Sequence, residues 1–87
     1  MFEYDPNKSQ SNKQKHGIDF EEAQQLWKDH NLLIFNVQTE PESRQLGIAK
    51  LNNKHWSAIF TLRGNNIRLI SVRRARKKEI ELYEENK

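Results

Sequence analysis

The sequence predicts an α+β domain: an antiparallel sheet of about four strands, with two N-terminal helices packed on one face, followed by a C-terminal helix. Two patterns predict this class. The N-terminal segment carries helix-capping residues, whereas the second half contains short apolar and β-branched runs separated by turn residues. With 87 residues, of which 34% are apolar, the chain can build one modest core. We therefore expect residues 1–87 to form a single domain.

The N-terminal segment predicts a short strand at "FEY" and then a helix over "PNKSQSNKQKH". Asp5 is placed as its N-cap, Pro6 occupies the first helical position and Gly17 follows the last turn. The interior of this helix has no apolar stripe, so we expect it to lie on the surface and to be held by its ends.

A second helix is predicted directly after that glycine. Asp19 as N-cap, with Glu22 three residues later, forms the pattern of a capping box. Phe20, Ala23 and Trp27 fall on one face of this helix. We expect that face to pack on the core.

Four apolar runs predict the strands: "NLLIFNV", "RQLGIAKL", "HWSAIFTL" and "NIRLISVR". The turns between the last three runs, "NN" and "GNN", contain residues that tolerate the positive φ of hairpin turns. An antiparallel meander results. The final "ARKKEIELYEENK" predicts a C-terminal helix with Ile80 and Tyr83 on one side.

Alternation along the last two runs predicts the faces of their strands. The apolar set of the third run, which includes Trp56 and Phe60, should face the helices together with Ile70 and Val72 of the fourth run. A sheet face that exposes hydroxyl and guanidinium groups suits bidentate phosphate contacts, although many antiparallel sheets have a solvated polar face without a function. The polar residues expected on this uncovered face are Ser57, Thr61, Arg63, Ser71 and Arg73.

Charge is distributed unevenly along the chain, whose formal net charge is +3. Residues 46–78 contain nine Lys and Arg and no acid, whereas residues 18–45 contain six acids and two bases. Such a basic segment is suited to face nucleic-acid phosphates. The alternative is that these cations are solvated or pair with the acidic segments.

The composition also excludes several classes of protein. The chain has no cysteine, which rules out disulfides and thiolate metal sites, and three scattered histidines make a weak metal set, so we expect neither a metal nor a cofactor. No apolar run approaches the roughly 18 residues of a transmembrane helix, and the N-terminus lacks the pattern of a signal peptide. We expect a cytoplasmic protein without membrane contact.

Several short motifs occur in a fixed order: "EYDPNK", "KHGIDFEEA", "RQLG" and "FTLRGNNIRLISVRRARKKEIELY". In this order they resemble the BrnT family of type II toxin proteins, and the resemblance runs from about Phe2 to Tyr83. The chain departs from the family pattern at Tyr4, Ser43 and Val72, where members usually carry Trp, an acid and Ala. None of these departures removes a basic residue.

The resemblance implies a RelE-like fold and an endoribonuclease that inhibits translation. Cleavage would proceed without metal, by attack of the ribose 2′-hydroxyl on the adjacent phosphate. The implied partners are the RNA substrate and a cognate ribbon-helix-helix antitoxin of the BrnA type. Within the toxin–antitoxin complex, only the antitoxin would contact operator DNA. The resemblance also implies that the toxin dimerises within that complex.

This reaction needs cations around the phosphate and groups that transfer protons. We expect Arg44, Arg63 and Arg73 to clamp the phosphate, and Ser71 to bind RNA beside them. Lys15 or His16 would transfer protons, because an unperturbed imidazole titrates near pH 6.5. For this role the turn after the first helix must bring the Lys-His pair beside the arginines. The alternative is that both residues only complement the helix C-terminus.

Other basic and aromatic residues have structural interpretations. Arg74 is expected to pair with Glu79 or another acid, and Arg76, Lys77 and Lys78 to form a solvated helix face. Trp56 and Tyr83 are expected to be packing residues. At the level of function, the alternative to an enzyme is a non-catalytic basic module that binds RNA or the antitoxin and acts as corepressor of its own operon.

Overall fold

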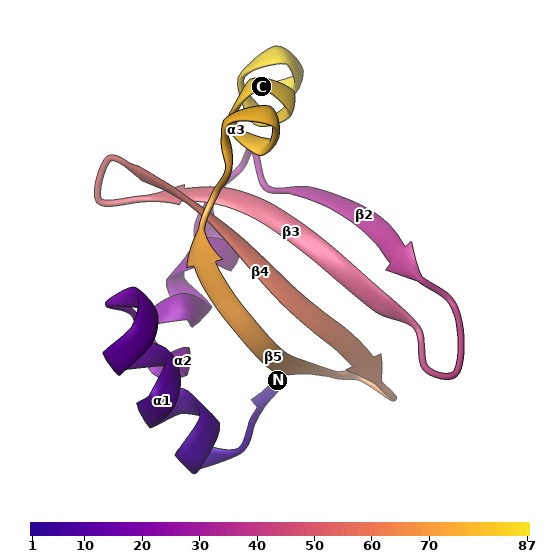
Figure 1. Ribbon diagram of the computed structural model, residues 1–87. Coiled ribbons are helices and arrows are strands. Elements are labelled where there is room, and N and C mark those ends of the chain that lie inside the picture. The colour runs from indigo at the N-terminus through magenta and orange to yellow at the C-terminus, as the bar shows by residue number, and fades with distance from the viewer.

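The computed structural model describes all 87 residues and shows one five-stranded sheet with the strand order β1-β5-β4-β3-β2 (Figure 1). The strands are β1 (Phe2–Glu3), β2 (Leu33–Gln38), β3 (Arg44–Leu51), β4 (Lys54–Arg63) and β5 (Asn66–Arg74). The helices are α1 (Pro6–His16), α2 (Phe20–Ala23), the 3-10 helix η1 (Gln24–Lys28) and α3 (Lys77–Asn86). The α+β class is therefore confirmed.

The sheet differs from the predicted one in strand number and direction. It has five strands rather than about four, and it is mixed because β1 runs parallel to β5, with Phe2 beside Ile67. The Ile67 N–H donates to the Met1 carbonyl at 2.8 Å. The two-residue "FE" strand thus adds to the edge of the predicted antiparallel meander.

The caps confirm where the first two predicted helices begin and where the first one ends, although the second continues after Ala23 as the 3-10 helix η1. Asp5 accepts a hydrogen bond from the Asn7 N–H at 2.8 Å, and Gly17 ends α1 in the left-handed conformation with φ 80°. Asp19 and Glu22 form the predicted capping box at the start of α2.

The prediction that only its ends hold α1 is wrong. Its buried face is polar: Ser9 Oγ accepts a hydrogen bond from the Phe20 N–H, and Asn12 is only 6% exposed. The Asn12 amide donates to the carbonyls of Ile18 and Val72 at 2.8 Å and accepts from the Val72 N–H at 3.1 Å. Asn12 therefore pairs with β5 as a neighbouring strand would, at the part of its edge that the short β1 does not reach.

The main core lies between the sheet and the segment that contains α2 and η1. Phe20, Ala23 and Leu26 pack there against Phe60 and other side chains of β3 to β5. Trp27 is half-buried against the same cluster, with its ring 5.1 Å from that of Phe60. The predicted inward faces of α2 and β4 are thus confirmed.

The predicted alternation of β5 is wrong in its first half. A register shift opposite Ile59 and Phe60 interrupts the strand at Ile70, so that Leu69 and Val72 both face the core. Since this bulge changes the face of each residue before it, Arg68 lies opposite Thr61 on the face away from the core rather than on the face of Val72.

The C-terminal helix packs on the other face of the sheet, at the end where β5 stops (Figure 1). Glu79 contacts Ser57 of β4, and Glu84 contacts His55 of the same strand. Tyr83 is buried, as predicted. The remainder of this face, which α3 leaves uncovered, is called the open face below. None of the helices has both the length and the apolar character that crossing a bilayer requires.

Candidate active site

The open face carries arginines in two of three neighbouring rows of β4 and β5, with Ser71 in the row between them. Arg73 lies opposite Ser57, Ser71 opposite Ile59 and Arg68 opposite Thr61. On β3, Gln45 pairs with the inward-facing Phe60, so alternation places Arg44 on the open face. The expectation that Ser57 and Thr61 are uncovered is wrong, because they are only 0% and 1% exposed and their hydroxyls donate to Glu79 and to the Ser43 carbonyl. The hydroxyl that remains partly exposed on this face is that of Ser71.

The end of α1 lies beside this face. Lys15 and His16 line a cavity of about 170 Å³ together with Ser71 and Ile70 of β5. The Asn12 pairing described above holds α1 against that strand. The structure thus brings both predicted proton carriers beside Ser71, which is two residues from Arg73 on the same strand face.

Arg73 is held by the C-terminal helix. Its Nη1 and Nη2 donate to the two carboxylate oxygens of Glu79 at 2.8 Å each. This contact lowers the pKa of Glu79 to about 2, with further hydrogen bonds from the Arg76 N–H and the Ser57 hydroxyl, and it raises the pKa of Arg73. A phosphate that binds the same two nitrogens of Arg73 must replace this carboxylate.

Arg63 does not meet Arg73. The two lie at opposite ends of the β4–β5 pair, separated by six residues of β4, or about 20 Å at the rise of a strand. The expectation that both clamp one phosphate is therefore wrong. Arg63 is half-exposed beside Glu3, with 4.0 Å between Nη1 and the carboxylate, and Arg68 donates to the same carboxylate at 3.3 Å.

Arg44 is the arginine of the open face that has no carboxylate partner. Its Nε is buried and makes no hydrogen bond. The preceding residue is fixed, because the Ser43 carbonyl accepts a hydrogen bond from the Thr61 hydroxyl at 2.6 Å. Arg44 thus has an unpaired donor on a fixed strand.

Sequence reasoning missed two residues of this region. Regular alternation along the fourth run places Arg68 on the face of Val72, because alternation alone cannot reveal a bulge. Asn12 was overlooked because its role depends on contact with a distant strand. A polar residue in the middle of a helix without an apolar stripe was the only available signal.

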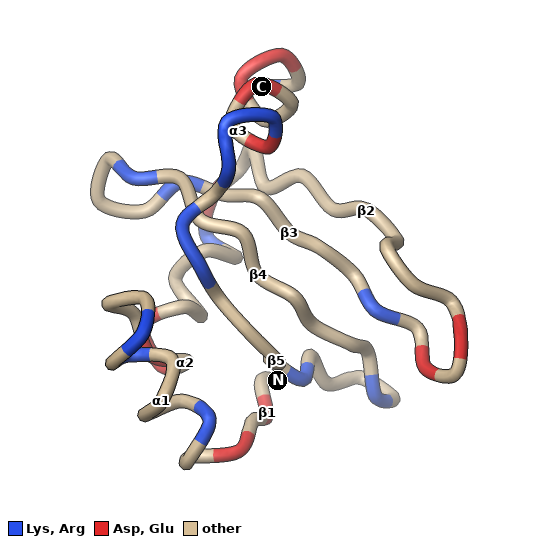
Figure 2. The backbone as a smooth tube through the Cα atoms, in the orientation of Figure 1, with Lys and Arg blue, Asp and Glu red and all other residues tan.

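The predicted pairing of Arg74 is also wrong. Its guanidinium lies 5.5 Å from the centre of the Trp56 ring, and Glu79 binds Arg73 instead. Trp56 belongs to the core, as predicted. Arg76, Lys77 and Lys78 are exposed, which agrees with a solvated helix face, and they continue the basic stretch from β5 into α3 (Figure 2). No group of three or more His, Asp or Glu side chains is placed to hold a metal ion.

These features define a small α+β protein with a basic sheet face and a basic helix end beside it. The family model described as "Ribonuclease toxin, BrnT, of type II toxin-antitoxin system" matches residues 4–79. The chain therefore belongs to the BrnT family of ribonuclease toxins, as its motifs predicted. No curated protein matches the chain.

Proposed function

We propose that this chain is a cytoplasmic endoribonuclease that cleaves RNA without metal, by attack of the 2′-hydroxyl on the neighbouring phosphate, and so inhibits translation. The observation that carries this proposal is the contact of α1 with β5. It brings Lys15 and His16 to the cavity that contains Ser71, one row from Arg73.

Each group has a distinct role in the proposed reaction. Arg73, released from Glu79, stabilises the negative charge that develops on the scissile phosphate, and Ser71 donates a hydrogen bond to it. Lys15 and His16 transfer protons to and from the ribose and leaving-group oxygens. Arg44 and Arg63 bind flanking phosphates, since their rows lie farther along the sheet.

The first test is incubation of the purified protein with unstructured RNA in EDTA. Cleavage with 2′,3′-cyclic phosphate products is expected, because the attacking group belongs to the RNA. Intact RNA despite retained binding would exclude the nuclease.

Variants test the assignment of residues. Arg73→Ala should abolish cleavage and growth arrest on expression, and Arg73→Lys should restore little activity because a lysine cannot make the bidentate contact. His16→Gln should remove the part of the pH–rate profile that depends on an imidazole, whereas a purely structural cap would leave the profile unchanged. Lys77→Ala, which removes an exposed cation of α3, is the control.

A cognate ribbon-helix-helix antitoxin is the proposed inhibitor, with dimerisation of the toxin in the complex. Partly neutralised cations on the open face favour a second candidate function. Arg68 and Arg73 are already paired with Glu3 and Glu79. A module that only binds its antitoxin, and thereby increases the affinity of that antitoxin for operator DNA, needs no free arginine. This corepressor predicts operator binding by the complex together with intact RNA in the cleavage assay.

A further inference from the structure

A second concave region lies away from the candidate active site, around the β3–β4 turn. It consists of two cavities of about 420 and 450 Å³ that share Gln25, Leu51 and Asn52 as a common wall. None of the residues assigned above to RNA cleavage lines either cavity. The two cavities together are called the turn groove below.

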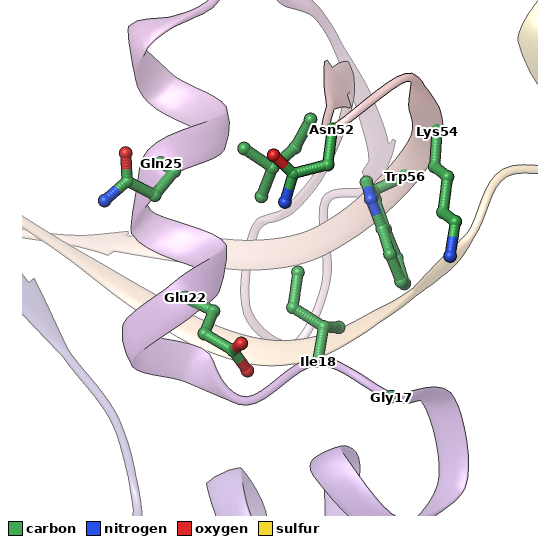
Figure 3. A pocket seen from close by; sticks show the side chains of 8 residues that line it. Gly17, Ile18, Glu22, Gln25, Asn52, Lys54 and Trp56 are labelled. Atoms are coloured by element: carbon green, nitrogen blue, oxygen red, sulfur yellow. The ribbon is translucent and has the colours of Figure 1, made fainter.

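The first cavity contains an unsatisfied polar group. Trp56 is only 7% exposed, and its indole N–H is buried without a hydrogen-bond partner. Figure 3 shows this nitrogen on the edge of the ring that is turned toward Asn52, whose side chain is exposed. Since an unpaired buried donor is unfavourable, an acceptor that enters as Asn52 turns aside would form a new hydrogen bond.

The chemistry of this cavity fits a planar, polar ring. Ile18, Leu51 and the Trp56 ring provide apolar walls, while the Gln25 and Asn52 amides supply both donors and acceptors. Amide side chains match the hydrogen-bonding edges of nucleobases. The volume lies in the range of pockets for small ligands.

The second cavity is basic. Lys28, Lys50 and His30 line it, and none of the three takes part in an ion pair. The one acid in its wall, Asp29, already accepts hydrogen bonds from the Tyr83 hydroxyl and from the backbone N–H groups of Lys50 and Asn31. The two lysines therefore remain available for a phosphate.

We propose that the turn groove binds one nucleotide of single-stranded RNA, with its base against Trp56 and its phosphate at Lys28 and Lys50. This subsite rests on the proposed function, because the RNA is the substrate of the nuclease. Gly17, which lines the first cavity, directly follows His16 at the cavity that contains Ser71. A strand cut at the open face can thus continue around the end of α1 into the groove.

The direct test follows the indole N–H resonance of Trp56 by NMR, with Trp27→Phe to assign it. The probe is a short RNA made resistant to cleavage by 2′-O-methyl groups, with AMP and inorganic phosphate as separate arms. A downfield shift of the Trp56 resonance with the oligonucleotide is expected. Saturation by AMP alone, with no added affinity from the oligonucleotide, would assign the groove to a free nucleotide and overturn the RNA subsite. An unmoved Trp56 resonance at saturating oligonucleotide would overturn the proposal altogether.

Variants separate the base contact from the phosphate contact. Asn52→Gly keeps the positive φ of 54° and removes the amide, so affinity for the oligonucleotide should fall about tenfold, whereas Asn65→Gly in the other hairpin turn should not change it. Replacing Lys28 and Lys50 by alanine should lower the slope of log K against log salt by about 0.7, since the two lysines hold one phosphate and each single-strand phosphate contributes about 0.7. The matched pair Lys77→Ala and Lys78→Ala removes the same charge. Equal effects of the two pairs would mean unspecific attraction and would overturn the subsite.

The outcome is independent of catalysis, because the probe cannot be cut. Cleavage of ordinary RNA with an unmoved Trp56 resonance would retain the nuclease and exclude the turn groove. A shifted resonance without cleavage would retain the groove and exclude the nuclease.

Discussion

At the scale of single residues, Glu79 connects the C-terminal helix to the open face. Its carboxylate accepts hydrogen bonds from the Ser57 hydroxyl, from two nitrogens of Arg73 and from the Arg76 N–H. One side chain thereby holds α3 in place and covers the arginine that we assign to the scissile phosphate. Stability and activity are therefore coupled at this position.

Replacing Glu79 by alanine should lower the free energy of unfolding by about 2 kcal/mol, because Arg73 and the buried Ser57 hydroxyl lose their partner. Urea denaturation at neutral pH measures the change. Glu81→Ala, at an exposed position of the same helix, should stay within about 0.5 kcal/mol of the wild type. An equal loss of unfolding free energy in both variants would show that the Arg73–Glu79 pair contributes little to stability.

The same carboxylate predicts a pH dependence of stability. Because the folded pKa of Glu79 is about 2, below its ordinary value of 4.5, its contribution is complete above pH 4.5 and is lost as the pH falls toward 2. Unfolding by urea across the acid range should show the difference between wild type and Glu79→Gln shrinking as the pH falls. A constant difference would contradict this assignment.

At the scale of elements, α1 shows how a helix without an apolar stripe can be held. Two polar side chains, Ser9 and Asn12, bond to backbone groups of other segments, and Gly17 then turns the chain toward α2. The position of Lys15 and His16 therefore depends on the hydrogen bonds of Ser9 and Asn12 and on the turn at Gly17.

Asn12→Ala should destabilise the fold by about 2 to 3 kcal/mol, since it leaves the buried N–H and C=O of Val72 unpaired. Hydrogen exchange at the Val72 amide should accelerate together with the loss of stability in urea. The exposed Gln10→Ala on the same helix is the control. Unchanged exchange at Val72 would mean that water or another group replaces Asn12.

Gly17→Ala should cost about 1 kcal/mol, because the φ of 80° is unfavourable for a residue with a Cβ even though no atom lies within 4 Å of it. Gly17→Asn should cost less, since asparagine tolerates this conformation. Thermal unfolding of the two variants provides the comparison, and an alanine variant as stable as the asparagine variant would contradict the argument.

The elements were more predictable from the sequence than the site. Local capping signals such as Asp5 and Asp19 predicted where the helices begin, because the capping carboxylate and the backbone N–H that donates to it lie within one turn. Arg68 and Asn12 were missed since their environments depend on a bulge and on a strand 60 residues away. The separation of Arg63 from Arg73 follows from the register of β4 and β5. The turn residues between the two strands suggest this register, but the alternation of apolar and polar residues alone does not determine it.

At the scale of the whole molecule, the two edges of the sheet differ in whether other residues cover them. On one side β1 and Asn12 cover β5, whereas β2 forms the other edge without a single charged residue. Its Val37 is 52% exposed, within a bulge that interrupts the regular pairing with β3. An uncharged edge strand with exposed β-branched residues favours association between chains.

Val37→Lys should therefore reduce self-association of the isolated protein while leaving its stability nearly unchanged. Light scattering at increasing concentration measures the first effect and urea denaturation the second. Thr39→Lys, which adds the same charge just outside the strand, controls for net charge. An equal reduction of self-association by both variants would show that net charge, rather than the β2 edge strand, determines the effect.

The covering of β5 by N-terminal residues has a consequence for the biosynthesis of this chain. Met1 and Asn12 form hydrogen bonds with residues 67 and 72, so these N-terminal contacts cannot form until residues 67–72 have been synthesised. During translation, the emerging chain holds Lys15 and His16 without Ser71 or Arg73. The ribosome that produces this protein should therefore have synthesised residues 67–73 before the proposed nuclease site is assembled.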